Sequence, residues 1–188
     1  MSDRLDADDV HALLASLGPQ GDAHILRAFS AVCCRRIWEH LTAESRAAVG
    51  IVEAWLAGLT TDEDLVRASQ SAADAVATAE RRLDIHIARN GHLFHAALAA
   101  AACAWLPETK FELITTGRGR VIKDSLEAAA LCASQSATGH AIAGFQHLTP
   151  VEAMHAAVET AWIAESAEQA AILRTLLEGQ GNHPGDEA

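Results

Sequence analysis

The side chains whose spacing points most directly to chemistry are two carboxylates and an imidazole in the C-terminal part of the chain. Glu152, His155 and Glu159 are spaced at i, i+3 and i+7, so a helix would present all three on one face. Glu-x-x-His is half of the ligand pattern of di-iron helical bundles, which take a second such motif and two further glutamates from other helices. The sequence has no second Glu-x-x-His. We therefore predict no metal or cofactor site, and a metal-binding enzyme or carrier that uses Glu152 and His155 is the alternative hypothesis.

The four cysteines are a second group with possible chemistry. Cys33 and Cys34 are adjacent, and on a helix their side chains point about 100° apart, which prevents both from binding one metal without distortion. Cys103 and Cys132 also lie in apolar helical patterns, no CxxC spacing occurs, and no secretory signal precedes them. These features favour buried, reduced thiols with a packing role, in a cytoplasmic protein.

A glycine-rich basic stretch at residues 115–123, TTGRGRVIK, precedes a predicted helix at a place where backbone N–H groups can hold an anion. It lacks the GxxxxGK[ST] order of a phosphate-binding loop, so an exposed turn is the favoured interpretation. The sequence also has no GxSxG or HExxH motif. We predict no catalytic residue, and a non-enzymatic protein is favoured over an enzyme.

Helices must position all of these side chains, and residues 24–59 show the clearest helical pattern. Asp22 and Thr42 are suited to N-capping, and Gly58 to the position just after a helix. The pattern predicts one helix that continues to Leu41 and a second that ends before Gly58. The apolar face of the first helix is Ile25, Phe29, Val32, Cys33, Ile37 and Leu41, and Arg27, Arg35 and Glu39 lie opposite.

Five further helices are predicted from caps and apolar spacing. The resulting fold is a single-domain, all-α bundle of about seven helices at residues 1–179, followed by a disordered tail at residues 180–188. A loop is predicted at residues 107–120. The further helices are residues 6–17, residues 61 to about 90 with an end at Asn90 and Gly91, residues 92–106, residues 121–145, and residues 149–178.

Composition excludes several classes of ligand. The 188 residues carry a net charge of −11, which repels nucleic acid and anionic membranes and would attract a basic partner. The longest nearly apolar run, residues 93–106, is shorter than the roughly 20 residues that span a bilayer. Residues 149–188 hold seven acids against one base, Arg174. The sequence therefore predicts a soluble protein whose acidic character is concentrated towards its C-terminus.

The apolar pattern also predicts the interior. Arg36 lies one turn from Cys33, where it would reach Glu53 or another acid on a packed neighbour and so connect two helices. The side chains predicted to be largely buried are Phe29, Cys33, Ile37, Val52, Trp55, Trp105 and Trp162.

The segments LRAFSAVCCRRIWEHL, EAWLAGLTTDEDL and EQAAILRTLL resemble a family of uncharacterised helical proteins that is abundant in planctomycetes. That family carries a CxCCRRIW run, which residues 33–38 match, while Ala31 stands where the family has its first cysteine. The missing cysteine argues against a metal role for this cluster.

A fainter similarity is to a family described as immunity proteins of bacterial polymorphic toxin systems. It rests on a cysteine and an arginine three apart, a further arginine before a helix that ends in Ala-Trp, and a later Gly-His-Ala run. Neither resemblance implies a catalytic residue. The matching positions are Cys33, Arg36, Arg46, Ala54, Trp55, Gly139, His140 and Ala141.

These observations favour a helical protein that acts by binding another protein, one of basic character, as an immunity-like partner of a toxin would. The residues predicted to contact this partner are Glu159, Glu165 and Glu168, because they lie in the acidic C-terminal part of the chain. The alternative is that these acids only keep an alanine-rich protein soluble. The sequence identifies neither the partner nor the oligomeric state.

Overall fold

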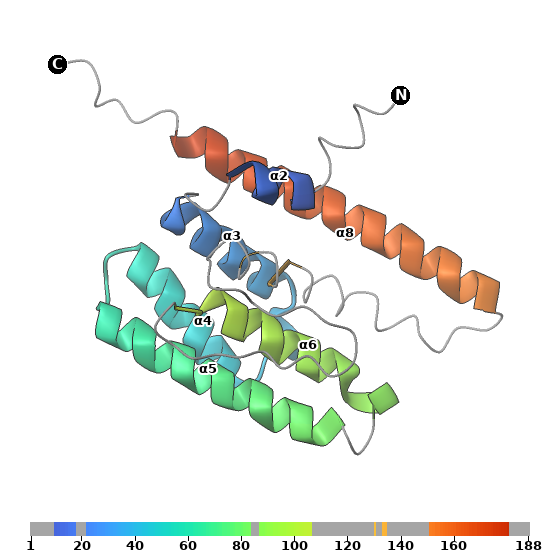
Figure 1. The fold of residues 1–188 in the computed structure, drawn as a ribbon, viewed down its shortest axis with the longest axis horizontal. Helices are drawn as coiled ribbons and strands as arrows, with labels where there is room; N and C mark the ends of the chain where they lie inside the picture. The colour runs from blue at the N-terminus through green and yellow to red at the C-terminus, as the bar shows by residue number, and fades with distance from the viewer. Residues whose placement is uncertain are drawn as a thin grey trace.

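The computed structural model describes residues 10–17, 22–83, 87–106, 130, 133–134 and 151–180. Within these residues the chain forms six α-helices and one 3-10 turn, with no strand, which confirms the predicted all-α bundle (Figure 1). The predicted helix start at residue 6, the predicted loop at residues 107–120, most of the predicted helix at residues 121–145 and the tail from residue 181 lie outside the described residues. The elements are α2 (Val10–Leu17), α3 (Ala23–Arg36), η1 (Trp38–His40), α4 (Ala43–Leu56), α5 (Asp62–Leu83), α6 (Ile87–Cys103) and α8 (Val151–Gln180).

Helix α3 lies at the centre of the bundle. It contacts α4 and α6 on one side and α8 on the other, and α2 packs along α8 (Figure 1). Helices α4, α5 and α6 pack against one another and complete the larger half of the core. Residues 24–59 therefore organise the fold, because they supply α3 and the first of the helices packed on it.

The predicted caps form as local hydrogen bonds. The Asp22 carboxylate accepts from the N–H of His24 at 2.7 Å, and Thr42 Oγ1 accepts from the N–H of Ser45 at 3.2 Å. Gly58 has a φ of +68° and ends α4 in a Schellman motif, in which its N–H donates to the Trp55 carbonyl.

Helix α5 begins with a reciprocal capping box. Thr61 Oγ1 accepts from the N–H of Asp64 at 3.2 Å, while the Asp64 carboxylate accepts from the N–H of Thr61 at 3.3 Å. Hydrogen bonds from the hydroxyls of Thr60 and Thr61 lower the pKa of Asp64 to about 2.

The prediction that the first helix of the central pair continues to Leu41 is wrong, because α3 ends at Arg36 and a 3-10 turn follows. Arg46 explains why the chain can leave the helix there. Its Nε donates to the carbonyl of Trp38 at 3.1 Å, and its Nη2 donates to the carbonyl of Glu39 at 3.0 Å. These bonds satisfy carbonyls that a continuing helix would have used. Leu41 is nevertheless buried, as predicted.

The predicted helix end at Asn90 and Gly91 is also wrong. Helix α5 ends at Leu83, and α6 begins at Ile87 and runs through both residues. A glycine inside a helix costs only about 1 kcal/mol. Packing of the following alanine segment against α3, α4 and α5 outweighs that cost. At its far end α8 continues through Gly179 to Gln180, beyond the predicted end at Glu178.

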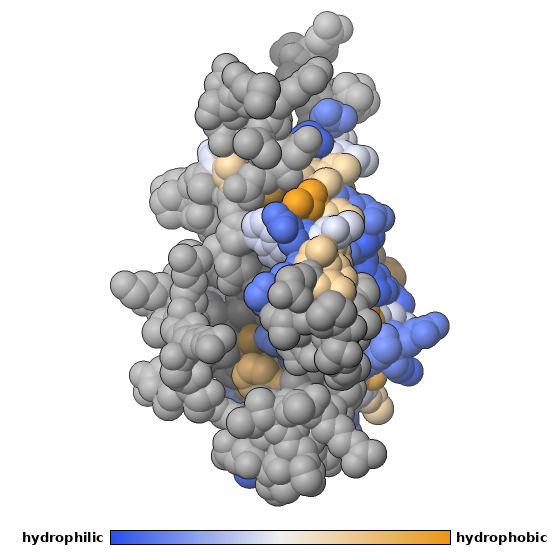
Figure 2. All heavy atoms as spheres, turned by 90° about the vertical axis from the view of Figure 1, so that its right-hand side faces the viewer, coloured by the Kyte–Doolittle hydropathy of each residue, from blue (hydrophilic) through white to orange (hydrophobic). Residues whose placement is uncertain are grey.

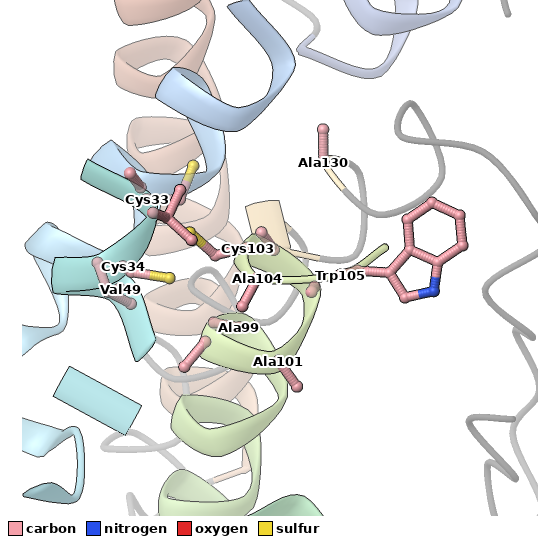
Figure 3. Packing of buried hydrophobic residues seen from close by; sticks show 14 of the residues in the cluster. Cys33, Cys34, Val49, Ala99, Ala101, Cys103, Ala104, Trp105 and Ala130 are labelled. Atoms are coloured by element: carbon pink, nitrogen blue, oxygen red, sulfur yellow. The ribbon is translucent and has the colours of Figure 1, made fainter. Parts of the chain in front are cut away.

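Alanines of α6 fill the middle of the larger half of the core. Every residue from Ala96 to Trp105 is buried, as expected for a helix with neighbours on several sides. Figure 3 shows part of this packing, with the alanines of α6 beside Cys34 and Val49. Of the seven side chains predicted to be largely buried, five are confirmed: Phe29, Cys33, Ile37, Val52 and Trp105.

The burial of Trp55 and that of Arg27 differ from the prediction. Trp55 is partly buried, packing against the core on one side while the ring of His24 stacks on it with centroids 4.9 Å apart. Arg27, predicted to lie opposite the apolar face, is buried with its guanidinium 5.4 Å from the centroid of the Trp55 ring. The reason is that α3 is covered on more than one side, so burial extends beyond the single apolar face that the spacing predicts.

No helix within the described residues combines the length and apolar character that crossing a membrane requires.

Candidate functional site

Arg36, at the end of α3, joins two carboxylates of α8. Its Nε and Nη2 donate to the two oxygens of Glu165, both at 2.8 Å, and its Nη1 lies 2.7 Å from Oε1 of Glu168. Gln169 is fully buried and donates from Nε2 to Glu165 at 2.8 Å, and it accepts a hydrogen bond from the Ser134 hydroxyl. Arg36 therefore pairs with acids on a packed neighbour, as predicted, and the acids are Glu165 and Glu168.

Glu53, the other acid considered for Arg36, pairs instead with Arg35. Arg35 Nε donates to Glu53 at 2.7 Å, and the Arg35 guanidinium lies 3.9 Å from the centroid of the Trp38 ring. Arg46 approaches the same ring at 5.8 Å. The guanidinium groups of Arg35 and Arg46 thus both make cation–π contacts with Trp38, and these contacts stabilise the turn between α3 and α4.

The ion pair with Arg36 alters the acidity of both α8 carboxylates. Burial raises the pKa of Glu165, but hydrogen bonds from Arg36 and Gln169 and the charge of Arg36 outweigh burial, so that this pKa is lowered overall. The hydrogen bond from Arg36 also lowers the pKa of Glu168. Because the folded protein lowers these pKa values, the ion pair stabilises the fold above the ordinary carboxylate pKa, and this stabilisation is lost as the pH falls.

The Glu165→Gln variant tests this pH dependence. It is expected to lower the free energy of unfolding by about 1–2 kcal/mol at pH 7, because the bidentate contact becomes a neutral one. The difference from wild type is expected to shrink as the pH falls through and below the ordinary carboxylate pKa, as Glu165 becomes increasingly protonated. Urea unfolding across this pH range measures both effects. Glu159→Gln is the matched control on the same helix, and a pH-independent difference for Glu165→Gln would contradict the expectation.

Helix α8 also carries exposed apolar side chains. Trp162 is 47% exposed and Ile163 is 56% exposed, so the prediction that Trp162 is buried is wrong. The physical reason is helix length. Helix α8 has 30 residues and the neighbouring α3 has 14, so α3 cannot cover the whole length of α8. Figure 1 shows the N-terminal, orange end of α8 extending past α3. Figure 2 looks onto that side of the molecule and shows hydrophobic atoms lying among hydrophilic ones.

The three predicted partner-binding residues occupy different environments. Glu159 is exposed one turn before Trp162 and Ile163. The Glu165 side chain is only 12% exposed, and that of Glu168 is 60% exposed. Both of the latter pair with Arg36, so α8 uses them to hold itself against α3. Glu159 is therefore the residue of the three most available to a partner, and spacing alone could not distinguish it from the others.

The alternative metal site is only partly described. His155 is exposed on α8, whereas the side chain of Glu152 lies outside the described residues. In the part of the chain whose side chains are described, no group of three or more His, Cys, Asp and Glu residues is placed to hold a metal ion.

Three thiols meet in the core between α3 and α6. Cys33, Cys34 and Cys103 are buried and not disulfide-bonded (Figure 3). A hydrogen bond with Cys103, together with burial, raises the pKa of Cys34. Burial raises the pKa of Cys33, and the charge of Glu165 adds to this effect. Cys33 and Cys34 are therefore suited to packing rather than to reaction as thiolates, and Cys103 is buried beside them.

We expect these thiols to be unreactive in the folded protein. N-ethylmaleimide under native conditions should leave Cys33, Cys34 and Cys103 unlabelled, because the reagent attacks an accessible thiolate. Labelling should become complete in concentrated urea. Mass spectrometry of the peptides measures the label at each cysteine, and rapid native labelling at Cys33 or Cys34 would show that the cluster is accessible.

Several positions that the sequence singles out have structural contacts here. Cys33 is buried, Arg36 joins α3 to α8, and Arg46 holds the turn between α3 and α4. Trp55 donates from Nε1 to Asp62 at 2.7 Å and so connects α4 to α5. Gly139, His140 and Ala141 lie outside the described residues.

Across the described residues the structure is thus an all-α bundle in which α8 exposes Trp162 and Ile163 beside Glu159. No protein-family model, no curated protein and no solved structure matches the chain. Its function is therefore inferred from its own residues.

Proposed function

We propose that this protein acts by binding another protein and that the contact surface lies on α8. The observation that supports this most directly is the exposure of Trp162 and Ile163 beside the exposed Glu159. Tryptophan is strongly enriched among the residues that dominate binding energy at protein interfaces. Adjacent exposed large apolar side chains on a helix are also a feature of surfaces that become covered by a partner.

The charge of the chain supports a basic partner. A net charge of −11 raises the rate of encounter with a positively charged protein and lowers it for an acidic one. The resemblance to immunity proteins of toxin systems points to the same kind of activity, the neutralisation of a partner by tight binding. The three unpaired thiols Cys33, Cys34 and Cys103 support a reducing compartment such as the cytoplasm.

Affinity capture from cells of the source organism at low salt tests the proposal. We expect the wild-type protein to retain a specific partner that is released at about 0.5 M salt, because screening weakens steering by surface charge. A Glu159→Lys variant should lose this partner. The matched control is Asp74→Lys, which makes the same change in net charge at an exposed position on α5. Capture of no specific protein by the wild type would overturn the proposal.

A further inference from the structure

The exposed apolar residues of α8 continue the face by which the same helix packs in the bundle. A stripe of residues at heptad spacing, alternately four and three apart, runs along this face, and its apolar members are Trp162, Leu173 and Leu176. Trp162 and Ile163 correspond, one heptad later, to Gln169 and Ala170, both fully buried. Two heptads later they correspond to Leu176 and Leu177, which pack against the core. The stripe consists of His155, Glu159, Trp162, Ser166, Gln169, Leu173 and Leu176.

The exposure of the residues on this stripe changes at Glu165, the first residue of α8 that pairs with Arg36. From Glu165 onwards α8 is held against α3, and its central side chains, such as Leu173, are buried. Before Glu165 the same face carries the exposed residues Glu159, Trp162 and Ile163. We call residues 151–164 the α8 overhang. Its 14 residues are about 21 Å long, which equals the length of a helix of four turns.

We infer that the α8 overhang is a docking site for a basic amphipathic helix of a partner protein, which packs along the heptad stripe. This inference rests on the proposed function and names the kind of partner. Two other helices, α3 and α2, pack against α8 within the bundle, and a partner helix would extend that helix-on-helix packing along the exposed part of the same face. The apolar side of the partner helix would cover Trp162 and Ile163.

The negative charge of this protein favours a partner helix that is basic. Glu159 lies in the middle of the overhang and would meet a lysine or arginine at the edge of the partner's apolar face. A second copy of this chain is disfavoured as the occupant, since two overhangs aligned at their centres would bring Glu159 against Glu159. Each copy would also add a charge of −11.

A labelled synthetic peptide tests the inference on the full chain. The probe is about three heptads long, with leucine at the a and d positions and lysine elsewhere. A second peptide carries glutamate in place of every lysine. Fluorescence anisotropy measures the dissociation constant for each. We expect saturable binding of the basic peptide, weakened in about 0.5 M salt, and no binding of the acidic one.

Two pairs of variants locate the site. Glu159→Lys is expected to weaken binding about tenfold, whereas Glu178→Lys makes the same charge change on the same helix and should weaken it less than twofold. Trp162→Ala is expected to weaken binding about tenfold, whereas Leu59→Ala removes an apolar side chain that is 80% exposed elsewhere and should have no effect. Circular dichroism confirms that each variant is folded.

Equal losses for Glu159→Lys and Glu178→Lys would mean that the peptide senses only net charge, and the inference would be wrong. A dimer detected by sedimentation of the protein alone and abolished by Ile163→Glu would identify a second copy as the occupant and would also overturn it. Affinity capture of a partner that is unaffected by Trp162→Ala would leave the proposed function standing and remove only the overhang from it.

Discussion

Replacing Phe29 with alanine is expected to lower the free energy of unfolding by about 3–5 kcal/mol. Phe29 is fully buried in α3, the helix that contacts both halves of the bundle, so the deleted ring would leave a cavity that neighbouring helices cannot close without losing other contacts. Urea unfolding followed by circular dichroism measures the change as a shift of the midpoint at constant slope.

Two further variants make the Phe29 result interpretable. Phe29→Leu keeps most of the buried volume and should cost about 1.5 kcal/mol or less, which preserves a measurable transition if the alanine variant does not fold. Leu59→Ala removes a side chain that is 80% exposed and should change stability by less than about 0.5 kcal/mol. A Phe29→Ala variant with the wild-type midpoint would show that α3 is not at the centre of the core.

Replacing Arg36 with alanine is expected to cost about 2–4 kcal/mol. The substitution leaves the largely buried carboxylate of Glu165 without its cation, and removing one partner of a buried pair is far more costly than removing both. The loss should be local, because the pair joins α8 to α3. Hydrogen exchange should therefore show reduced protection at residues 166–173 and little change in α4 and α5.

Arg35 provides a matched control for Arg36 in the same helix. Its pair with Glu53 is more exposed, at 47% and 32% for the two side chains, so Arg35→Ala should cost no more than about 1 kcal/mol. A double-mutant cycle with Arg36→Ala and Glu165→Ala should show positive coupling between the two sites. Equal costs for the two arginines would mean that burial does not strengthen the Arg36 pair.

The local signals in the sequence predicted local structure well. The caps at Asp22, Thr42 and Thr61 and the glycine stop at Gly58 all form, because each depends on hydrogen bonds between residues at most five positions apart. One helix boundary predicted from local signals is wrong. The Asn90–Gly91 pair resembles a helix end, yet α6 passes through it. The cost of about 1 kcal/mol for a glycine inside a helix is outweighed by the packing of the whole alanine segment that follows it.

In the candidate site, too, local features could be predicted from the sequence and long-range contacts could not. The sequence identified an acidic, helical C-terminal segment and the tendency of Arg36 to join helices. It did not separate Glu159 from Glu165 and Glu168, because all three differ only in which part of α8 lies against α3. It also placed Trp162 inside, since periodicity assigns a face to a helix but not the length over which a neighbour covers that face.

By itself, then, the sequence determined the all-α class, most helix starts and the acidic character of the chain. Helix starts and the all-α class follow from hydrogen bonds and apolar spacing between residues close together in the chain, and the acidic character follows from the sum of its charges. Only the tertiary structure decided that Arg27 is buried, that Glu165 is used internally and that Trp162 is exposed. Each of these depends on the relative lengths and positions of helices far apart in the chain, and Trp162 lies on the same face of α8 as Gln169 and Leu173, which are buried.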